Sequence, residues 1–412
     1  MNNSDGKAHF IRTLTVLQAF AVQDLEISVG TEEAPRHLLL TGPNGSGKST
    51  ILSALQAYLL NPQIAGGAQI RSIQSLLQGA RGQVHTLPEA HASVVRQLTG
   101  QLETLKALPA VETQPAPQAP VPRAETLLIH APAIRTLRLN QPTGPARLET
   151  EPFVRGVNGA PFILQYLVNL RSEGALARED GDNDVADAIA ARLAKFEDGL
   201  GSIFSDPGLK LVFNRSTWRY SVQFGDGRDV GFDQLPDGFS SIVYLWSSLL
   251  LAAEGLRRQG ITDPEGWALL DEPELHLHAE LQERILPFLC SLFPRVQFIV
   301  ATHSPAVLAS LAGATVFDLA SREAYVSEDL HGIRYGTIFT EHFGIETDFD
   351  VATTAKLKRL GVLYKSARVL GSPEQQEFET LANELRDVPH LLVAQVTRDI
   401  ENPSHSRAAS DD

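Results

Sequence analysis

The sequence predicts an α/β fold with a mixed β-sheet, and two observations support this class. The apolar run 38–40 leads directly into a glycine-rich segment that matches G-x-x-x-x-G-K-[ST] from Gly42 to Ser49. A buried strand, a glycine-rich turn and then a helix is the order that a phosphate-binding loop requires. Further along, the apolar runs 266–270 and 294–301 both end in polar side chains. Ligand sites of parallel α/β sheets collect at such strand ends.

The N-terminal segment predicts two strands that feed the strand before the glycine-rich loop. Residues 10–29 tend to alternate with period two, and the two strands meet near Ala21. Phe20 stands at this junction, where it could stack on an adenine, although an aromatic side chain in a strand is more often part of the core. Residues 49–60 carry apolar side chains at helical spacing and form the helix behind the loop.

The glycine-rich loop predicts how a nucleotide would be held. Its glycines leave room for a backbone whose N–H groups point at a β-phosphate near the start of the helix. Lys48 should bridge the β- and γ-phosphates, and Ser49 should offer its hydroxyl to Mg²⁺. The predicted nucleotide-binding residues of the loop are Gly42, Asn44, Gly45, Ser46, Gly47, Lys48, Ser49 and Thr50.

An insertion separates this loop from the next core strand, which is expected at 126–130. Residues 71–107 have apolar side chains roughly at helical spacing and predict one or two helices. Residues 109–123 form a tract rich in Pro, Ala and Gln, for which we expect an extended, mobile chain without a packed core.

The middle of the chain predicts helices and then a β-meander. Helices are expected at 162–170 and 184–198, joined by an acidic connector at 179–182. Strands are expected at 209–213, 217–224 and 228–232, followed by the segment 233–241 and an apolar helix at 242–255. Six basic residues of this region form either a local basic strip or ordinary solvated charges, and we favour the second interpretation. They are Arg192, Lys195, Lys210, Arg215, Arg219 and Arg228.

Two later strands carry the side chains expected to do chemistry. The strand that starts at 266 ends in Asp271 and Glu272, whose side chains diverge because strand residues alternate. Asp271 is then expected to hold Mg²⁺, and Glu272 to act as the base that polarises the attacking water. His303 follows the strand 294–301 and is placed to contact the γ-phosphate and this water. The alternative is a histidine that only caps or packs the strand end.

Four motifs together carry a resemblance to a known family. They are residues 42–49, 235–240, 269–278 and 301–305. This set resembles the ABC-class ATPases of the RecF, SMC and overcoming-lysogenization-defect group, and especially the stand-alone ATPases of antiphage systems such as Septu and PARIS. The resemblance implies ATP and Mg²⁺ as cofactors and a pair of heads that sandwich two ATP molecules. It also implies that Asp237, Gly238 and Ser240 reach the γ-phosphate held by the partner head.

The chain departs from the family pattern in residues 235–240, called the signature segment below. Pro236 stands where the family has a serine that binds the γ-phosphate. Either Ser240 or Ser241 substitutes for it, or turnover is slow and the protein acts as an ATP-held switch. For the glutamine that links the nucleotide to the inserted domain, Gln141 and Gln165 are both candidates.

A second possible metal site is weak on spacing grounds. His276 and His278 are flanked by Glu274 and Glu280, but a spacing of two places the histidines on different faces of a helix. We therefore expect no metal there.

Composition narrows the cellular context. The net charge of −14 argues against the basic surface of a constitutive nucleic-acid-binding protein. DNA contact is left as an alternative, through the local basic strip described above. The single cysteine, Cys290, lies in an apolar run and is expected to be buried and inert. No apolar stretch is expected to span a bilayer, and no signal peptide precedes the fold, so we expect a cytoplasmic protein without a membrane partner.

The C-terminal part predicts a helical tail. Helices are expected at 356–370 and 374–385, and residues 401–412 are polar enough for disorder. The tail has no acidic cluster on strands such as a nuclease needs, so an effector would be a separate protein, for example a nuclease. The expected domains are 1–70 (N-terminal ATPase lobe), 71–125 (helical insertion and linker), 126–345 (remainder of the head) and 346–412 (helical tail).

The leading functional hypothesis is an ATP-binding and hydrolysing switch of the ABC class. It would dimerise around ATP, or form a higher homo-oligomer, and control a partner effector in DNA-linked antiphage defence or repair. One alternative is an ATP-binding scaffold or sensor with little turnover. Another is a nucleotide-binding subunit of an ABC transporter, against which Pro236 and the long insertion argue. A simple P-loop kinase would not need the signature segment or His303.

Overall fold

A computed structural model describes the chain in two units, Met1–Ile338 and Phe339–Asp412, which are treated separately below. The described residues are 10–62, 67–82, 88–106, 108–115, 126–154, 156–261, 263–330, 355–356, 359–360, 362–363 and 373–386.

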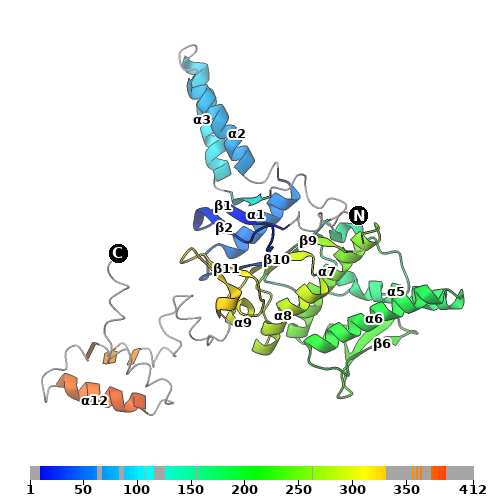
Figure 1. Ribbon diagram of the computed structural model, residues 1–412. Coiled ribbons are helices and arrows are strands. Elements are labelled where there is room, and N and C mark those ends of the chain that lie inside the picture. Colours follow the sequence, from blue (N-terminus) through cyan, green and yellow to red (C-terminus); the bar gives the residue numbers. More distant parts are fainter. Residues whose placement is uncertain are drawn as a thin grey trace. The chain divides into compact units, whose positions relative to one another are not determined.

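A six-stranded mixed sheet forms the centre of the first unit (Figure 1), with the strand order β12-β11-β3-β10-β9-β5. Strands β11, β3, β10, β9 and β5 are parallel, and β12 pairs antiparallel with β11 at the edge. Every residue of β3, β10 and β11 is buried, which explains why these strands are almost uninterrupted apolar runs. The strands are β3 (Leu38–Thr41), β5 (Thr126–Ala131), β9 (Glu265–Asp271), β10 (Val296–Ala301), β11 (Thr315–Asp318) and β12 (Glu323–Val326).

A second, antiparallel sheet with the order β2-β1-β4 lies on the other side of helix α1. The two strands expected around Ala21 are confirmed, and their turn consists of Phe20 and Ala21. Buried apolar residues of α1 share one core cluster with both sheets, so the helix that begins at the phosphate loop is fixed from two sides. The elements are β1 (Thr13–Ala19), β2 (Val22–Ser28), β4 (Ala110–Gln114) and α1 (Lys48–Leu60).

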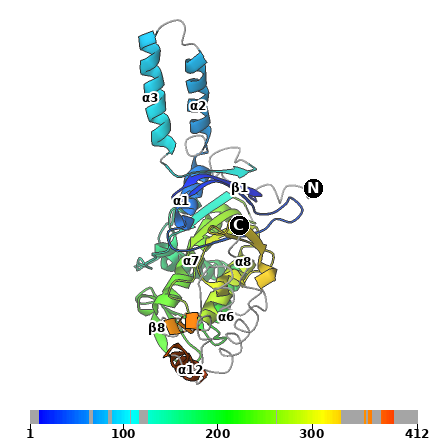
Figure 2. The ribbon, with the colours of Figure 1, turned by 90° about the vertical axis from the view of Figure 1, so that its left-hand side faces the viewer.

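The insertion is a helical hairpin of α2 (Gly67–Gly82) and α3 (Pro88–Lys106), which projects from the antiparallel sheet (Figures 1 and 2). The expectation of helices here is confirmed. The expectation that residues 109–123 have no packed core is wrong at its start, because β4 pairs with β1 and Ala110 and Val111 are buried. The prolines flank β4 rather than interrupt it, so the strand keeps all its N–H donors. Residues 116–125 lie outside the described residues.

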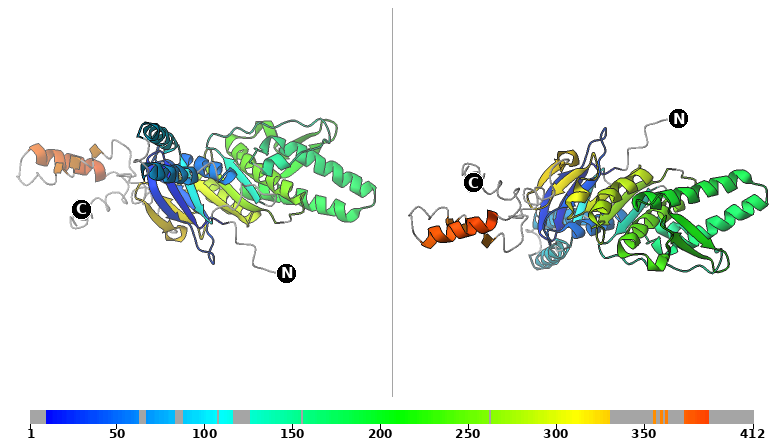
Figure 3. Two further views of the ribbon diagram at one scale, coloured as in Figure 1. Left: turned by 90° about the horizontal axis from the view of Figure 1, so that it is seen from above. Right: turned by 90° about the horizontal axis from the view of Figure 1, so that it is seen from below.

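The helical part of the first unit follows β5. Helices α5 and α6 lie side by side as a long pair (Figure 3), and the predicted meander forms a third sheet with the order β6-β7-β8. Helix α5 continues to Glu179, well past the expected end at 170. The elements are α4 (Glu151–Val154), α5 (Ile163–Glu179), α6 (Asn183–Ile203), β6 (Lys210–Asn214), β7 (Arg219–Gln223), β8 (Asp229–Gly231), α7 (Asp237–Arg257), α8 (Ala279–Leu292) and α9 (Pro305–Leu308).

Helix α7 corrects one expectation about membranes. Among the described residues it is the one helix that is long and apolar enough to cross a bilayer by length and composition. Its most apolar window is 83% buried inside the protein, so its composition is that of a core helix.

In the second unit, helix α12 (Pro373–Arg386) confirms the helix expected at 374–385. Arg359 makes two hydrogen bonds of 2.8 and 2.7 Å to the carboxylate of Glu377 on this helix. The helix expected at 356–370 lies mostly outside the described residues, and the tail 401–412 lies wholly outside them.

His37 precedes β3 and joins two other elements of the core. Its Nδ1 accepts a hydrogen bond of 3.0 Å from the main-chain N–H of Phe298, so the proton resides on Nε2, which faces Cys290 Sγ at 3.7 Å. Burial lowers the pKa of His37 to about 4 and raises that of Cys290 to about 12. The thiol is therefore uncharged at neutral pH, although Cys290 is partly exposed and not fully buried as the sequence predicted.

We predict that His37 makes the fold acid-sensitive. Between pH 6.5 and about 4 the unfolded imidazole is protonated while the folded one stays neutral. The unfolded state then binds more protons. The free energy of unfolding should therefore decrease as the pH is lowered from 6.5 to about 4, by up to roughly 3 kcal/mol. Denaturant unfolding of His37→Asn, which keeps an acceptor for Phe298, should show a flatter pH dependence. The exposed His278→Asn serves as control, and an unchanged slope in His37→Asn would contradict the prediction.

Candidate functional site

The central strand β10 brings the predicted site residues to one edge of the sheet. It pairs in parallel with β3 on one side and β9 on the other, and Ala301 is in register with Leu40 and with Asp271. At the ends of the three strands lie the phosphate loop (42–49), the adjacent carboxylates Asp271 and Glu272, called the acidic pair below, and His303. The structure therefore assembles at one edge the residues that the sequence scatters over more than two hundred positions.

The phosphate loop has a backbone that only glycine adopts readily. Gly42, Gly45 and Gly47 have φ angles of 134°, 79° and 101°. A Cβ on Gly47 would lie 2.9 Å from the carbonyl oxygen of Ala19, which leaves no room for a side chain. Helix α1 begins directly after Gly47 without a side-chain cap, so its first N–H groups are free to bind an anion.

Lys48 is folded onto the loop that precedes it. Its Nζ donates hydrogen bonds to the carbonyl oxygens of Gly42 at 2.8 Å and Pro43 at 3.1 Å, and the residue is 6% exposed. Burial lowers the pKa of Lys48, and the carboxylates of Glu272 and Asp271 oppose this change. The ammonium is thus hydrogen-bonded to the phosphate loop and close enough to the acidic pair for these carboxylates to act on its pKa.

Asp271 is the last residue of β9, whereas Glu272 lies beyond the strand, so strand alternation does not govern the direction of both side chains. Asp271 is buried, and its Oδ1 has no hydrogen-bond partner within the described part of the chain. Glu272 adopts a left-handed φ of 44°, an uncommon conformation for a residue with a side chain, while its N–H donates to the carbonyl of Ala301 at 2.8 Å. This backbone turn directs its carboxylate toward His303, with 3.7 Å between Oε1 and Nε2.

His303 lies between charges of opposite sign. Burial lowers its pKa, and the Lys48 cation lowers it further, while the carboxylates of Glu272 and Asp271 oppose both effects. With a side chain that is 31% exposed, it is neither a fully packed core histidine nor a free surface one.

Glu274 has a supporting role that the sequence did not indicate. Its Oε1 accepts hydrogen bonds from Thr302 Oγ1 at 2.5 Å and from the main-chain N–H of His303 at 3.0 Å. Burial raises the pKa of Glu274, and these hydrogen bonds oppose that change. Glu274 therefore fixes the backbone that carries His303, whereas the sequence treated it only as one member of a weak metal cluster.

Three further residues near the site were missed because no motif contains them. Asp318 ends β11 beside the loop, since a Cβ on Gly42 would lie 3.2 Å from its Oδ1. His130 on β5 is close enough to Asp271 for this carboxylate to act on its pKa, which burial lowers. Arg135 donates to the main-chain carbonyls of the acidic pair, as described further below.

The signature segment lies at the start of α7, next to the segment that follows the acidic pair. Pro236 occupies the N-cap position without a side-chain hydrogen bond, and Asp237 and Gly238 follow it. A Cβ on Gly238 would lie 2.9 Å from the carbonyl oxygen of His276, so this turn packs against the segment after the acidic pair. The hydroxyl of Ser240 donates to the carbonyl of Leu235 at 3.2 Å.

Neither candidate glutamine reaches the phosphate loop through the hydrogen bonds it makes. Gln141 donates to the carbonyl of Trp218 at 3.3 Å, and Gln165 donates to the carbonyl of Gly144 at 2.9 Å.

The described residues contain no group of three or more His, Cys, Asp or Glu side chains arranged for a metal ion. The residues that remain for Mg²⁺ are Asp271, with its unpartnered Oδ1, and Ser49, which is exposed in the first turn of α1. Magnesium commonly takes only one or two protein ligands and completes its shell with water and phosphate oxygens. These two residues therefore fit a nucleotide-dependent Mg²⁺ site better than a resident metal centre.

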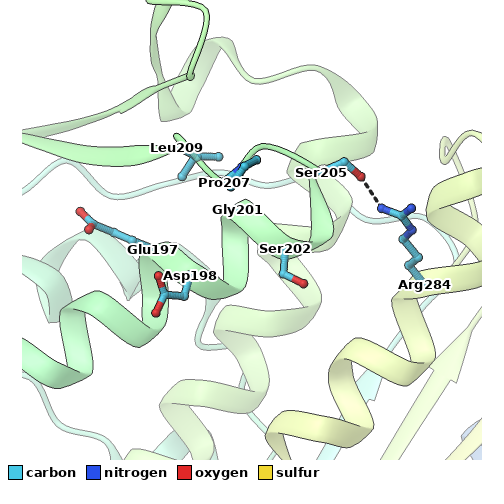
Figure 4. A pocket seen from close by; sticks show the side chains of 8 residues that line it. All are labelled: Glu197, Asp198, Gly201, Ser202, Ser205, Pro207, Leu209 and Arg284. Carbon is cyan, nitrogen blue, oxygen red and sulfur yellow. Dashed lines mark hydrogen bonds between the residues drawn. The ribbon is translucent and has the colours of Figure 1, made fainter.

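A separate hollow of about 480 Å³ lies between the end of α6, the loop before β6 and α8 (Figure 4). Arg284 on α8 donates a hydrogen bond to Ser205 across one side of this hollow and pairs with Glu280 at 2.8 Å. None of the predicted site residues lines it. Its lining residues are Glu197, Asp198, Gly201, Ser202, Ser205, Pro207, Leu209 and Arg284.

The phosphate loop, the acidic pair and the histidine on neighbouring parallel strands have the arrangement typical of an ABC-like P-loop ATPase. Comparison with known proteins agrees with this class. Residues 162–309 match the family described as "AAA domain, putative AbiEii toxin, Type IV TA system", and residues 22–66 match "P-loop containing region of AAA domain".

Relatives of this chain include proteins of bacterial Septu and retron systems. The chain is 25% identical over 395 residues to the Septu protein PtuA of Bacillus mycoides (strain KBAB4), covering 92% of this chain and 50% of the relative. It is 33% identical over 94 residues to the Retron Vc95 probable ATPase of Vibrio cholerae, covering 21% of this chain and 17% of that protein. The chain thus spans about half of the length of PtuA and a smaller part of the retron protein. The expected resemblance to ABC-like ATPases of the defence type is confirmed.

Among solved structures, the chain is similar to the SMC head domain from Thermotoga maritima. The TM-score is 0.36 at 13% sequence identity, covering 75% of this chain and 94% of that chain.

We predict that Gly47→Ala abolishes nucleotide binding. An alanine at this position would have to keep the φ of 101°, which residues with a side chain rarely adopt. Its Cβ would also lie 2.9 Å from the carbonyl oxygen of Ala19, so the loop must shift. Gly227→Ala is the matched control, since Gly227 has a φ of 89° but nothing within 4 Å of its Cβ position. Both variants should lose roughly 1 kcal/mol or more of stability, but only Gly47→Ala should lose binding of a fluorescent ATP analogue. Wild-type affinity in Gly47→Ala would contradict the close fit of this loop.

Proposed function

We propose that the protein binds Mg-ATP at the carboxyl edge of the central sheet, hydrolyses it, and uses this cycle as a molecular switch. The observation that carries the proposal is the meeting of Lys48, Glu272 and His303 at one sheet edge, with 3.7 Å between the last two. The N–H groups of the phosphate loop and Lys48 would bind the phosphates. The chemistry then follows from the acidic pair and its neighbours.

In this proposal the acidic pair divides two roles. The unpartnered Oδ1 of the buried Asp271 and the hydroxyl of Ser49 would hold Mg²⁺, which neutralises phosphate charge when bound. The side chain of Glu272 is 32% exposed, so water reaches its carboxylate, which would polarise the attacking molecule. His303, whose lowered pKa favours the neutral imidazole at pH 7, would orient that water and the γ-phosphate.

Phe20 supports a place for the base of the nucleotide. The ring is 71% exposed and lies beside the phosphate loop, because a Cβ on Gly45 would be 3.8 Å from its Cε1. An apolar ring left this exposed at the turn is not part of the core. We therefore assign to Phe20 the stacking of adenine, the first of the two interpretations that the sequence left open.

The signature segment would act on a second copy of the chain. Asp237, Gly238 and Ser240 form the first turn of α7, where free N–H groups favour an anion such as a γ-phosphate held by the partner head. Pro236 contributes no hydroxyl, and that of Ser240 is bonded to Leu235. If Ser240 took the role of the missing signature serine, its hydrogen bond to Leu235 would have to break. This cost favours slow turnover and a long-lived ATP-bound dimer.

The cellular role is proposed from the relatives. Similarity to Septu and retron proteins supports a switch that controls a separate effector, such as a nuclease, in antiphage defence within the cytoplasm. A scaffold that binds ATP with little turnover is the second candidate, and the engaged hydroxyl of Ser240 is the observation that favours it.

We expect Lys48→Ala to lose ATP affinity. Hydrogen bonds to charged groups contribute about 1.5–3 kcal/mol each, so loss of the ammonium should weaken binding roughly 100-fold or more. The exposed Lys210→Ala should bind ATP as the wild type does. Calorimetric titration with Mg-ATP measures both. Retained binding in a folded Lys48→Ala protein would refute the site.

We expect Glu272→Gln to form an ATP-dependent dimer. Removing the base while keeping its shape should trap a sandwich of two heads, so the light-scattering mass should double from 44.8 kDa when Mg-ATP is added. The double variant Lys48→Ala/Glu272→Gln should stay at the starting mass. An unchanged mass despite measured ATP binding would leave a preformed oligomer or a lone scaffold, and the starting mass separates these two.

A further inference from the structure

Arg135 makes the densest set of polar contacts near the candidate site. It follows β5, four residues after that strand ends at Ala131. Its guanidinium donates to four main-chain carbonyls and one hydroxyl. The acceptors are the carbonyl oxygens of Pro132 (2.9 Å), Asp271 (2.7 Å), Glu272 (2.9 Å) and Pro273 (3.4 Å), and Ser241 Oγ (3.3 Å from Nε and 3.1 Å from Nη2).

One end of this contact set holds the acidic pair. Three of the carbonyls belong to consecutive residues, so the guanidinium spans the turn in which the chain leaves β9. That turn contains the left-handed φ of Glu272, a conformation that costs about 1 kcal/mol or more unless the surroundings hold it. The rigid, planar fork of an arginine suits several carbonyls at fixed positions, whereas a lysine offers a single point of attachment.

The other end of the contact set holds α7, the helix that begins in the signature segment and is called the signature helix here. Ser241 lies on α7, one residue after the proposed signature residue Ser240, and is 7% exposed. The same two segments also touch where Gly238 packs against the carbonyl of His276. The first turn of α7 and the turn after β9 are thus joined twice, once by close packing and once through Arg135. Among the described residues, the hydrogen bonds of Arg135 go to these segments and to Pro132, and none goes to the phosphate loop.

We propose that Arg135 is a positioning residue that couples the signature helix to the acidic pair. It sets the backbone of Glu272 according to the position of α7, without taking part in nucleotide binding. The proposal rests on the proposed function and adds to it a route between the surface that would meet a second copy and the base of the same chain. Loss of Arg135 should therefore lower the turnover rate and leave ATP affinity near its wild-type value.

Hydrogen exchange of the full-length protein without nucleotide tests the coupling directly. Arg135→Ala and Arg135→Lys should speed amide exchange at least about tenfold in peptides covering 237–242 and 271–277, while peptides from the phosphate loop and β10 exchange as in the wild type. Ser241→Ala keeps the carbonyl contacts and should speed exchange in 237–242 alone. Arg138→Ala, an exposed arginine of the same segment, is the matched control. Unchanged exchange at 271–277 in Arg135→Ala overturns the proposal.

Steady-state hydrolysis and ATP titration test the consequence. We expect Arg135→Ala and Arg135→Lys to lower kcat at least tenfold while the Kd for ATP changes less than about threefold, and Arg138→Ala to match the wild type. Full rescue by Arg135→Lys would mean that charge alone matters and would overturn the positioning role. A loss of ATP affinity equal to the loss of kcat would do the same.

The exchange experiment and the kinetic experiment together separate a failure of this proposal from a failure of the proposed function. If the wild type binds but does not hydrolyse ATP, the hydrolysis part of the proposed function fails, and the exchange experiment still decides whether Arg135 couples the two segments. If Arg135→Ala does not fold, Ser241→Ala and Arg135→Lys carry the same test. Unchanged exchange at 237–242 in a folded Ser241→Ala protein overturns the coupling to α7.

Discussion

The two parallel ladders along β10 are the interaction on which the rest of the site depends. Backbone pairing with β3 and β9 fixes the register of three strands, and therefore the heights at which the phosphate loop, the acidic pair and His303 leave the sheet. Since all residues of β10 are buried, a slip of this strand would expose apolar side chains and break both ladders. The geometry of the chemistry is thus stabilised by the core rather than by the site itself.

The site concentrates buried charge, and main-chain groups balance most of it. Lys48 is bonded to loop carbonyls, and Glu274 accepts from Thr302 and from the backbone of His303. Two carboxylate oxygens are exceptions, because Asp271 Oδ1 and Glu274 Oε2 are buried without a hydrogen-bond partner in the described part of the chain. An unpaired buried carboxylate oxygen costs stability in the free protein. At Asp271, the proposed Mg²⁺ ligand, a bound cation would relieve that cost, so the proposed site would favour its ligand by being incompletely satisfied without it.

The sequence predicted the features whose signals are local. The phosphate loop, the acidic pair, the meander and the two strands around Ala21 all show patterns within a few residues, and the fold class followed from them. The sequence missed β4 because five strand residues, Ala110–Gln114, stand between prolines in a tract of disordered composition. It missed the roles of Arg135 and Glu274 because those roles exist only through residues far away in the chain. An isolated arginine after a strand has no pattern, and its partners in the acidic pair and on α7 lie more than one hundred positions away.

The pairing of β4 with β1 has a consequence for how the inserted hairpin can vary. The chain leaves the head at the end of α1 and returns through β4 to the sheet that packs on α1, and Arg71 near the start of the hairpin pairs with Glu112 on β4 at 2.6 Å. Both ends of the hairpin are therefore anchored next to each other at its base. Helical turns added to or removed from α2 and α3 in equal number would change the reach of the arm without changing the register of any strand in the head. The arm can thus diverge in length among homologues as an independent module, while the nucleotide edge keeps its geometry.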